Sequence, residues 1–202
     1  LDARRLSIVS FVVHAPSGAY LHHNYVVALL NDLFGIQSRG GCSCAGPYGH
    51  ALLGIDLDRS HDFEREISHG CEGIKPGWVR VNFNYFVSDA VVDYVIEAVR
   101  LVARDGGRLL PDYRFDRTTG RWHHRAGPVE PPLRLRDTGY AVDGTFTYPR
   151  HTARAPESEL AAYLVDGARI LAAGAPTRGR RGEVSESFDA LRWFELPAEC
   201  LD

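Results

Sequence analysis

The sequence predicts an α+β fold, in which a small antiparallel or mixed sheet is covered by helices on one face and followed by a C-terminal extension. Residues 21–34 carry apolar side chains at helical spacing, and residues 78–85 alternate between apolar and polar side chains. The predicted order of elements up to residue 104 is strand, helix, short strand, loop, strand and helix. A strand with this alternation buries one side and offers polar groups on the other.

The first predicted elements are a buried strand and an amphipathic helix. Leu6–Val13 is β-branched and apolar without a helical period, and an Ala-Pro-Ser-Gly turn follows it. The helix spans Leu21–Phe34, and Gly35 stands where a C-terminal cap is expected. Its apolar positions recur at intervals of three and four residues: Val26, Leu29, Leu30 and Leu33. Ile36–Arg39 is then long enough only for an edge strand.

The stretch Gly35–His50 concentrates chemical groups, with an arginine, two cysteines, a histidine and five glycines in sixteen residues. Pro47 suits the first turn of a short helix ending near Leu53, because proline needs no backbone donor there. This helix would place Cys44 just ahead of a helix N-terminus. Residues 56–77 are polar and are expected to form a long loop.

A strand begins at Trp78, and a helix follows from its predicted N-cap, Ser88, to Arg104. The strand turns four apolar side chains to its buried face, Val79, Val81, Phe83 and Tyr85. Arg80 lies on the opposite, polar face, where a guanidinium on an otherwise buried strand needs an anionic partner. The helix is expected to bury Val92, Val95, Ile96, Val99 and Val102.

Beyond residue 106 the predicted elements are shorter. They are a hairpin at Tyr113–His124, a proline-rich linker at Gly127–Pro132, a strand at Gly144–Tyr148, a helix at Pro156–Ala173 and a final strand at Phe188–Leu196. The final strand is expected to dock back on the domain.

Composition limits the classes of function. The net charge is −3 with both signs interspersed, so neither a nucleic-acid partner nor a membrane surface is expected. No apolar run approaches the roughly 20 residues that span a bilayer, and the N-terminus lacks the features of a signal peptide, so we expect a cytoplasmic location. Four cysteines at irregular spacing favour reduced thiols over a disulfide framework. The absence of methionine, even at residue 1, leads us to expect a piece of a longer protein.

The loop Arg39-Gly-Gly-Cys-Ser-Cys-Ala-Gly-Pro47, with the strand and helix before it and the strand and helix from Trp78, resembles the C-terminal small domain of class V aminotransferases. These are fold-type I pyridoxal-phosphate enzymes. The nearest branch is the cysteine desulfurase and selenocysteine lyase group, whose loop has the form Arg-x-Gly-His-His-Cys-Ala-x-Pro. Five positions match this form in register: Arg39, Gly41, Cys44, Ala45 and Pro47. The resemblance implies a small domain at residues 1–106 and leaves residues 107–202 as an extension packed on it.

This resemblance implies an enzyme that uses pyridoxal 5'-phosphate to act on an amino acid, usually as a homodimer. Arg80 would bind the α-carboxylate of the substrate, because a planar guanidinium holds both carboxylate oxygens, and Arg39 would support this binding. Cys44 corresponds to the thiol that attacks the substrate sulfur and carries a persulfide. A cysteine desulfurase is therefore the more specific prediction.

The chain also departs from the family pattern. Cys42 and Ser43 replace the paired histidines, and residues 56–77 form an insertion relative to the desulfurases with a short loop. The single lysine, Lys75, lies before proline in a loop-like stretch, where the family has no Schiff-base lysine. We therefore expect an upstream domain to bind most of the cofactor and this chain to be inactive alone.

Two alternatives belong to other classes of protein. A zinc module would use sulfur and imidazole ligands from Cys42, Cys44, His50, His61, His69 and Cys71. Their intervals differ from the Cys-x2-Cys pattern of common structural zinc sites. A non-catalytic interaction domain would instead bind a partner through the C-terminal extension.

Overall fold

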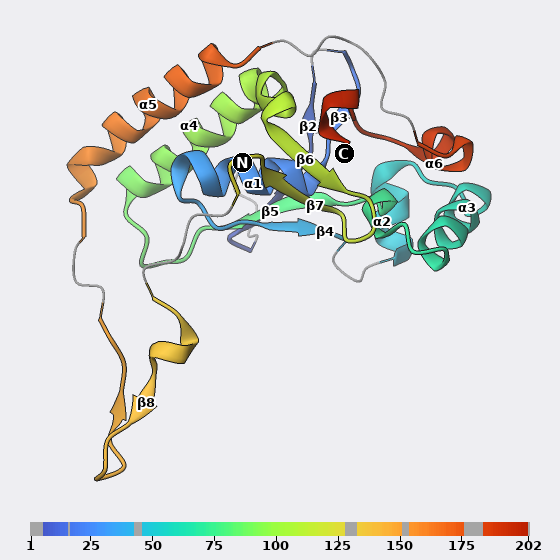
Figure 1. The fold of residues 1–202 in the computed structure, drawn as a ribbon. Coiled ribbons are helices and arrows are strands. Elements are labelled where there is room, and N and C mark those ends of the chain that lie inside the picture. The colour runs from blue at the N-terminus through green and yellow to red at the C-terminus, as the bar shows by residue number, and fades with distance from the viewer. Residues whose placement is uncertain are drawn as a thin grey trace.

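The computed structural model describes residues 6–15, 17–42, 46–127, 133–150, 154–175 and 184–201. They form an α+β fold around a three-stranded antiparallel sheet (Figure 1). The strands of this sheet are β1 (Ile8–Phe11), β5 (Trp78–Asn82) and β4 (Arg39–Gly41), in this spatial order. The central strand therefore comes from the alternating segment, and the small sheet, predicted as antiparallel or mixed, is antiparallel. The predicted burial of Phe83 and Tyr85 is wrong, because β5 ends at Asn82: Phe83 is only partly buried and Tyr85 is exposed.

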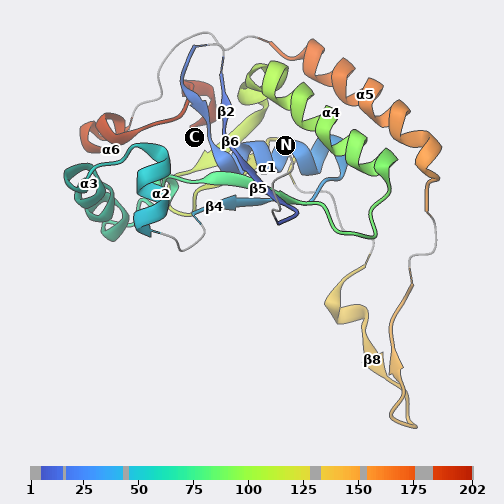
Figure 2. The same cartoon turned by 180° about the vertical axis from the view of Figure 1, so that it is seen from behind.

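Six α-helices are described, with three strand pairs beside the main sheet. The helices are α1 (His23–Phe34), α2 (Gly46–Leu53), α3 (Leu57–Ser68), α4 (Asp89–Asp105), α5 (Leu160–Ala173) and α6 (Glu186–Leu191). The strand pairs are β2 (Val13–His14) with β3 (Tyr20–Leu21), β6 (Tyr113–Asp116) with β7 (Arg121–His124), and β8 (Gly139–Tyr140) with β9 (Phe146–Thr147). Helices α1, α4 and α5 lie on one side of the main sheet, and α2, α3 and α6 group at one end of it (Figures 1 and 2). None of the described helices is both long enough and apolar enough to cross a membrane.

Helix α1 lies at the centre of the core. Three of its four predicted apolar positions, Val26, Leu29 and Leu30, are almost fully shielded from solvent, whereas Leu33 is only partly buried. Tyr25, which was not predicted in this stripe, is fully buried. Gly35 ends the helix in the left-handed conformation at φ 64°, which an L side chain rarely adopts. The Tyr25 hydroxyl donates a hydrogen bond to the Gly106 carbonyl over 2.7 Å, which connects α1 to the end of α4.

The hydrophobic core is continuous across residue 106. Side chains from the C-terminal half pack into the same cluster as α1: Tyr113, Phe115, Trp122, Leu171, Phe188, Phe194, Leu196 and Cys200. The predicted hairpin is present as β6 and β7, and its Trp122 ring lies 4.9 Å from the ring of Tyr25. The C-terminal extension is thus part of the fold that positions α1.

The prediction of a long loop at residues 56–77 is wrong, because α3 occupies most of it. The Asp56 carboxylate caps the helix by accepting a hydrogen bond from the Arg59 backbone N–H over 2.8 Å. Only Phe63 and Glu66 of this helix are buried. Because so few side chains of this helix are buried, its sequence shows almost no helical pattern of apolar residues.

The prediction of a final strand at Phe188–Leu196 is also wrong, but the prediction that this segment docks back on the domain is correct. Ser185 caps α6 through the Phe188 backbone N–H, and the helix continues to Leu191. Only Phe194 forms a β-bridge, with Tyr20. The segment returns to the core because Phe188, Leu191, Phe194 and Leu196 are all buried.

Two other elements differ in detail from their predictions. Helix α4 begins at the predicted cap, but it buries Tyr94, Ala98, Leu101 and Val102 while Ile96 is 38% exposed, because α5 and α1 cover a different face. Strand β1 is half exposed instead of buried, since it forms an edge of the sheet.

An arm made of residues 133–150 projects from the body of the protein (Figures 1 and 2). It contains β8 and β9, the second of which lies within the predicted strand Gly144–Tyr148. Three rings follow one another along it, with 5.4 Å between the centroids of Tyr140 and Phe146 and 5.4 Å between those of Phe146 and Tyr148. Residues 128–132 of the predicted linker lie outside the described part of the chain.

Glycines allow β4 to approach its neighbours closely. A Cβ atom added to Gly40 would lie 2.5 Å from Asn24 Oδ1, at the start of α1. A Cβ atom added to Gly77, just before β5, would lie 2.6 Å from the carbonyl carbon of Gly41 and 2.9 Å from the nitrogen of Cys42. The backbone contact at Gly77 therefore fixes the point where the glycine-rich loop leaves β4.

We predict that Gly77→Ala destabilises the protein by about 2–3 kcal/mol, because the new methyl group meets backbone atoms that cannot rotate away. Gly46→Ala is the matched control, since among the described residues no heavy atom outside its own neighbours and helix backbone lies within 4 Å of its added Cβ. It should change stability by less than about 1 kcal/mol. Urea unfolding followed by circular dichroism measures both, and equal effects would contradict the contact at Gly77.

Candidate functional site

Arg80 lies in the middle of the main sheet with a partner on each side. Its cross-strand partners are Ser10 on β1 and Arg39 on β4. Directly opposed residues of antiparallel strands point to the same face, with Cβ atoms about 4.5–5.5 Å apart. Ser10, Arg80 and Arg39 therefore form a row across the sheet, called the arginine row below. The structure thus brings together the two arginines that the sequence predicted for one site.

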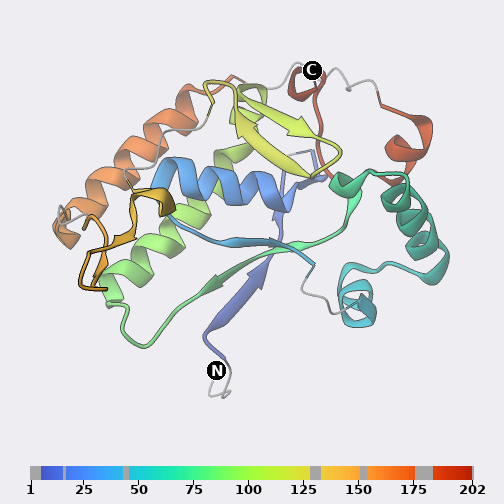
Figure 3. The ribbon, with the colours of Figure 1, turned by 60° about the horizontal axis from the view of Figure 1, so that its bottom comes forward.

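The arginine row lies on the face of the sheet that α1 leaves open. Val79 and Val81, on either side of Arg80, are buried and point to the opposite face. Figure 3 shows α1 and α4 together on one side of the three strands. Arg80 is half-buried and Arg39 is exposed. Both guanidinium groups are therefore accessible to a ligand on the open face.

Within the described part of the chain, no ion pair or hydrogen bond joins the Arg39 or Arg80 side chain to a carboxylate. Like charges placed directly opposite each other destabilise a sheet. An anion bound between the two guanidinium groups would reverse this repulsion, and the planar fork of arginine fits a carboxylate or a phosphate. The arginine row has the positive charge of an anion-binding site, and its two arginines are cross-strand neighbours.

Trp78 and α2 close one end of the open face. Trp78 lies two residues before Arg80 on the same face of β5, opposite Gly41 in register. It is buried under α2, where a Cβ atom on Gly49 would lie 3.2 Å from its ring. Its indole N–H is buried without a hydrogen-bond partner among the described residues. Helix α2 is thus held beside the arginine row by a close glycine–tryptophan contact.

The predicted nucleophile, Cys44, lies in residues 43–45, outside the described residues, so its role stays a prediction. Cys42, at the end of the described loop, is an exposed free thiol. Cys200 is buried, and its thiol donates a hydrogen bond to the Leu110 carbonyl over 3.2 Å. Burial raises the pKa of Cys200 to about 12, which keeps this thiol protonated and unreactive at neutral pH.

Metal ligands are not gathered in the described residues, where no group of three or more histidine, cysteine, aspartate or glutamate side chains could hold an ion. The described members of the expected zinc set belong to no such group: Cys42, His50, His61, His69 and Cys71. A zinc site that includes Cys44 stays untested.

The single lysine does not suit pyridoxal phosphate. Lys75 forms an ion pair with Glu72, and both side chains are partly exposed. A Schiff-base lysine needs a neutral amine in a sheltered pocket beside the cofactor. Lys75 therefore does not fit covalent attachment of the cofactor.

A cluster of rings at the start of α1 was not predicted. His22 is almost fully buried and uses both ring nitrogens: Nδ1 accepts from the Asn24 N–H over 3.1 Å, so Nε2 carries the proton and donates to the Gly73 carbonyl over 3.1 Å. The His23 ring stacks on His22 at 4.2 Å and on Trp193 at 5.7 Å. The adjacent histidines are visible in the sequence, but nothing there indicates that Trp193 covers them.

Comparison with known proteins gives no assignment: no family model, curated protein or solved structure matches this chain.

The buried histidines predict a stability that falls in acid. Burial lowers the pKa of His23 to about 4, below the value of 6.5 expected when the chain is unfolded. Between these values the unfolded chain binds more protons, so unfolding becomes easier as the pH falls from about 6.5 to 4. His23 alone contributes about 3 kcal/mol to this change, and the lowered pKa of His22 adds to it.

The measurement is the free energy of unfolding in urea at several pH values. His23→Phe keeps a ring on Trp193 but removes the titrating group, so its stability should depend less on pH. His69→Gln, at an exposed position, should leave the dependence unchanged. A wild-type slope retained in His23→Phe would show that other groups cause the acid sensitivity.

Proposed function

We propose that this chain is the substrate-binding C-terminal part of a pyridoxal-phosphate enzyme that resembles the class V aminotransferases and acts on an amino acid. The observation that carries the proposal is the arginine row, in which Arg80 and Arg39 lie directly opposite each other on an open sheet face. In this proposal Arg80 binds the α-carboxylate of the substrate, and Arg39 supplies the second positive charge.

The surroundings of Arg80 suit this role. It lies on the central strand β5, which pairs with β1 on one side and β4 on the other, so the base of the side chain is rigid. Half burial keeps the guanidinium near the sheet, where a charge-assisted hydrogen bond is stronger than in bulk water. Arg39, on the three-residue edge strand β4, is more exposed and can adjust to the ligand.

The cofactor is assigned to residues outside this chain. Lys75 is paired with Glu72, and the proposal uses no other group of this chain for covalent attachment. When bound, pyridoxal phosphate would supply the electron-withdrawing ring that the amino-acid chemistry needs. The task of this chain is to bind and orient the substrate carboxylate, and formation of the complete site in a homodimer stays part of the proposal.

The desulfurase assignment is the finer part of the proposal, and it rests on Cys44. The chain before Cys44 contains Gly41, which is paired with Trp78. The chain after Cys44 forms α2, which covers Trp78. The loop that carries Cys44 therefore begins and ends next to the arginine row. A thiolate in this loop would be favoured by the positive charge of the two arginines.

Carboxylate binding can be tested on the 202-residue chain itself. We predict that about 50 mM acetate raises the free energy of unfolding by about 1 kcal/mol relative to chloride at equal ionic strength, if the dissociation constant is about 10 mM. Arg80→Gln and Arg39→Gln should lose this gain, because each removes half of the positive pair. Urea unfolding in the two salts gives the difference directly.

The control is Arg169→Gln on α5, where an exposed arginine is paired with Asp166. It should keep the full response to acetate. An equal acetate response in all four proteins would mean that the anion acts elsewhere, and the arginine row would then lose its assigned role.

The enzyme-level prediction concerns the protein that also contains the cofactor-binding domain. Arg80→Gln should raise the KM for the amino acid about 10- to 100-fold, the loss expected for a charge-assisted hydrogen bond, while cofactor absorbance is retained. Cys44→Ala should abolish sulfide release from cysteine and leave amino-acid binding intact. Sulfide release at the native rate by Cys44→Ala would remove the desulfurase assignment and leave the arginine row unaffected.

A further inference from the structure

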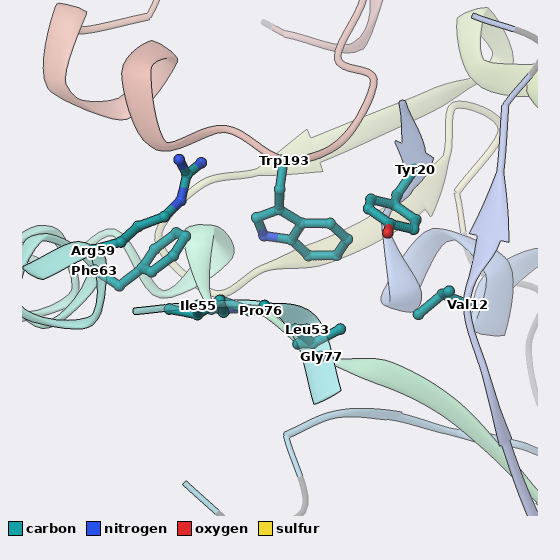
Figure 4. A pocket seen from close by; sticks show the side chains of 10 residues that line it. Val12, Tyr20, Leu53, Ile55, Arg59, Phe63, Pro76, Gly77 and Trp193 are labelled. Atoms are coloured by element: carbon teal, nitrogen blue, oxygen red, sulfur yellow. The ribbon is translucent and has the colours of Figure 1, made fainter. Parts of the chain in front are cut away.

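A second candidate site lies away from the arginine row, in a pocket between α3 and the C-terminal segment. Its volume is about 230 Å³ (Figure 4). The walls come from five separate parts of the chain: Val12 and Tyr20, Leu53–Ile55, Arg59 and Phe63, Pro76 and Gly77, and Trp193. Almost all of these side chains are apolar or aromatic, which is the usual lining of a small-molecule site.

Trp193 forms a fixed wall of this pocket. Its indole N–H donates a hydrogen bond to the Ile74 carbonyl over 3.0 Å. Its ring lies parallel to the ring of His23, with 8° between the planes and 5.7 Å between the centroids. In Figure 4 the Trp193 side chain extends into the space between Phe63 and Tyr20. A flat ring bound there would meet an aromatic surface that is already held in place, so little conformational entropy would be lost.

Arg59 gives the pocket a positive charge. Its guanidinium carbon lies 5.7 Å from the ring centroid of Phe63, a cation–π distance that keeps the charged group at the pocket wall. None of the residues that line the pocket is an aspartate or glutamate. Within the described part of the chain, no ion pair or hydrogen bond occupies the Arg59 guanidinium. The Tyr20 hydroxyl, on the other side of the pocket, is a second hydrogen-bond donor.

The size of the pocket restricts its ligand. A closed apolar cavity of about 150 Å³ in another protein holds benzene. A pocket of about 230 Å³ can therefore hold one six-membered ring with a short substituent. The apolar walls favour the ring, and Arg59 favours an anionic substituent.

We propose that this pocket binds a small aromatic carboxylate, with the ring stacked on Trp193 and the carboxylate paired with Arg59. The site does not depend on the proposed function, because it uses neither Arg39 nor Arg80. A free aromatic acid and the C-terminal phenylalanine of a peptide carry the same chemical group, and the assay below separates these two sources.

The test uses phenylacetate as the probe and its neutral isostere phenylacetamide as the matched ligand. The chain contains three tryptophans, so its indole N–H signals in a proton–nitrogen spectrum are three internal reporters. The Trp193 signal should shift with phenylacetate, whereas the signal of Trp122, which is buried in the core, should not. Phenylacetamide should bind about tenfold more weakly, because it lacks the charge that Arg59 recognises.

Arg59→Gln should weaken phenylacetate binding about tenfold and leave phenylacetamide binding unchanged. Arg65→Gln is the control on the same helix, because Arg65 is exposed, is paired with Asp62 and does not line the pocket. Arg80→Gln should also have no effect on the Trp193 shift, which separates this result from the outcome at the arginine row. Tighter binding of a short peptide ending in phenylalanine would identify a chain terminus as the source of the ligand.

Three results would overturn the proposal. The first is the absence of a Trp193 shift with phenylacetate. The second is equal affinity for phenylacetate in Arg59→Gln and the wild type, which would remove the carboxylate contact. The third is a shift of the same size and affinity with acetate, which would show that the aromatic ring contributes nothing.

Discussion

The two hydrogen bonds of His22 hold together the parts of the chain on which both candidate sites depend. One connects the imidazole to the first turn of α1, and the other connects it to the Gly73 carbonyl, just before β5. Rings from the C-terminal segment close around it, with Phe194 at 4.5 Å and Trp193 at 5.4 Å. His22, a buried and neutral side chain, therefore contacts the start of α1, the segment before β5 and the C-terminal segment.

The segment leading into β5 serves two surfaces of different chemistry. Gly77 lines the aromatic pocket and also touches the backbone of Gly41 and Cys42, where the glycine-rich loop begins. Three residues later, Arg80 belongs to the arginine row on the open face of the sheet. A ligand that displaced Gly77 would thus act on the loop through backbone atoms, without any side chain between them.

The sequence was most informative where local patterns decide structure. The apolar stripe and the terminal glycine of α1, and the alternation of β5, predicted the central helix and the central strand. Helix α3 was missed because its packing buries only Phe63 and Glu66, and α6 was mistaken for a strand because a short apolar segment has no clear period. The resemblance placed Arg39 and Arg80 in one site, but their direct opposition depends on the register of two strands that are far apart in the chain. Trp193 could not be connected to His23 at all, since only the folded core brings residue 193 to residue 23.

The β-bridge between Tyr20 and Phe194 has a consequence for the order of folding. Segments about 170 residues apart in the sequence must meet before the core is complete, because Leu196 and Cys200 are buried in the same cluster as α1. Contacts between such distant residues form slowly, since a long loop must close first. During synthesis on a ribosome, α1 would therefore remain incompletely covered until residues 194–200 have emerged. The apolar stripe of α1 is exposed in that interval and offers a surface that a chaperone can bind.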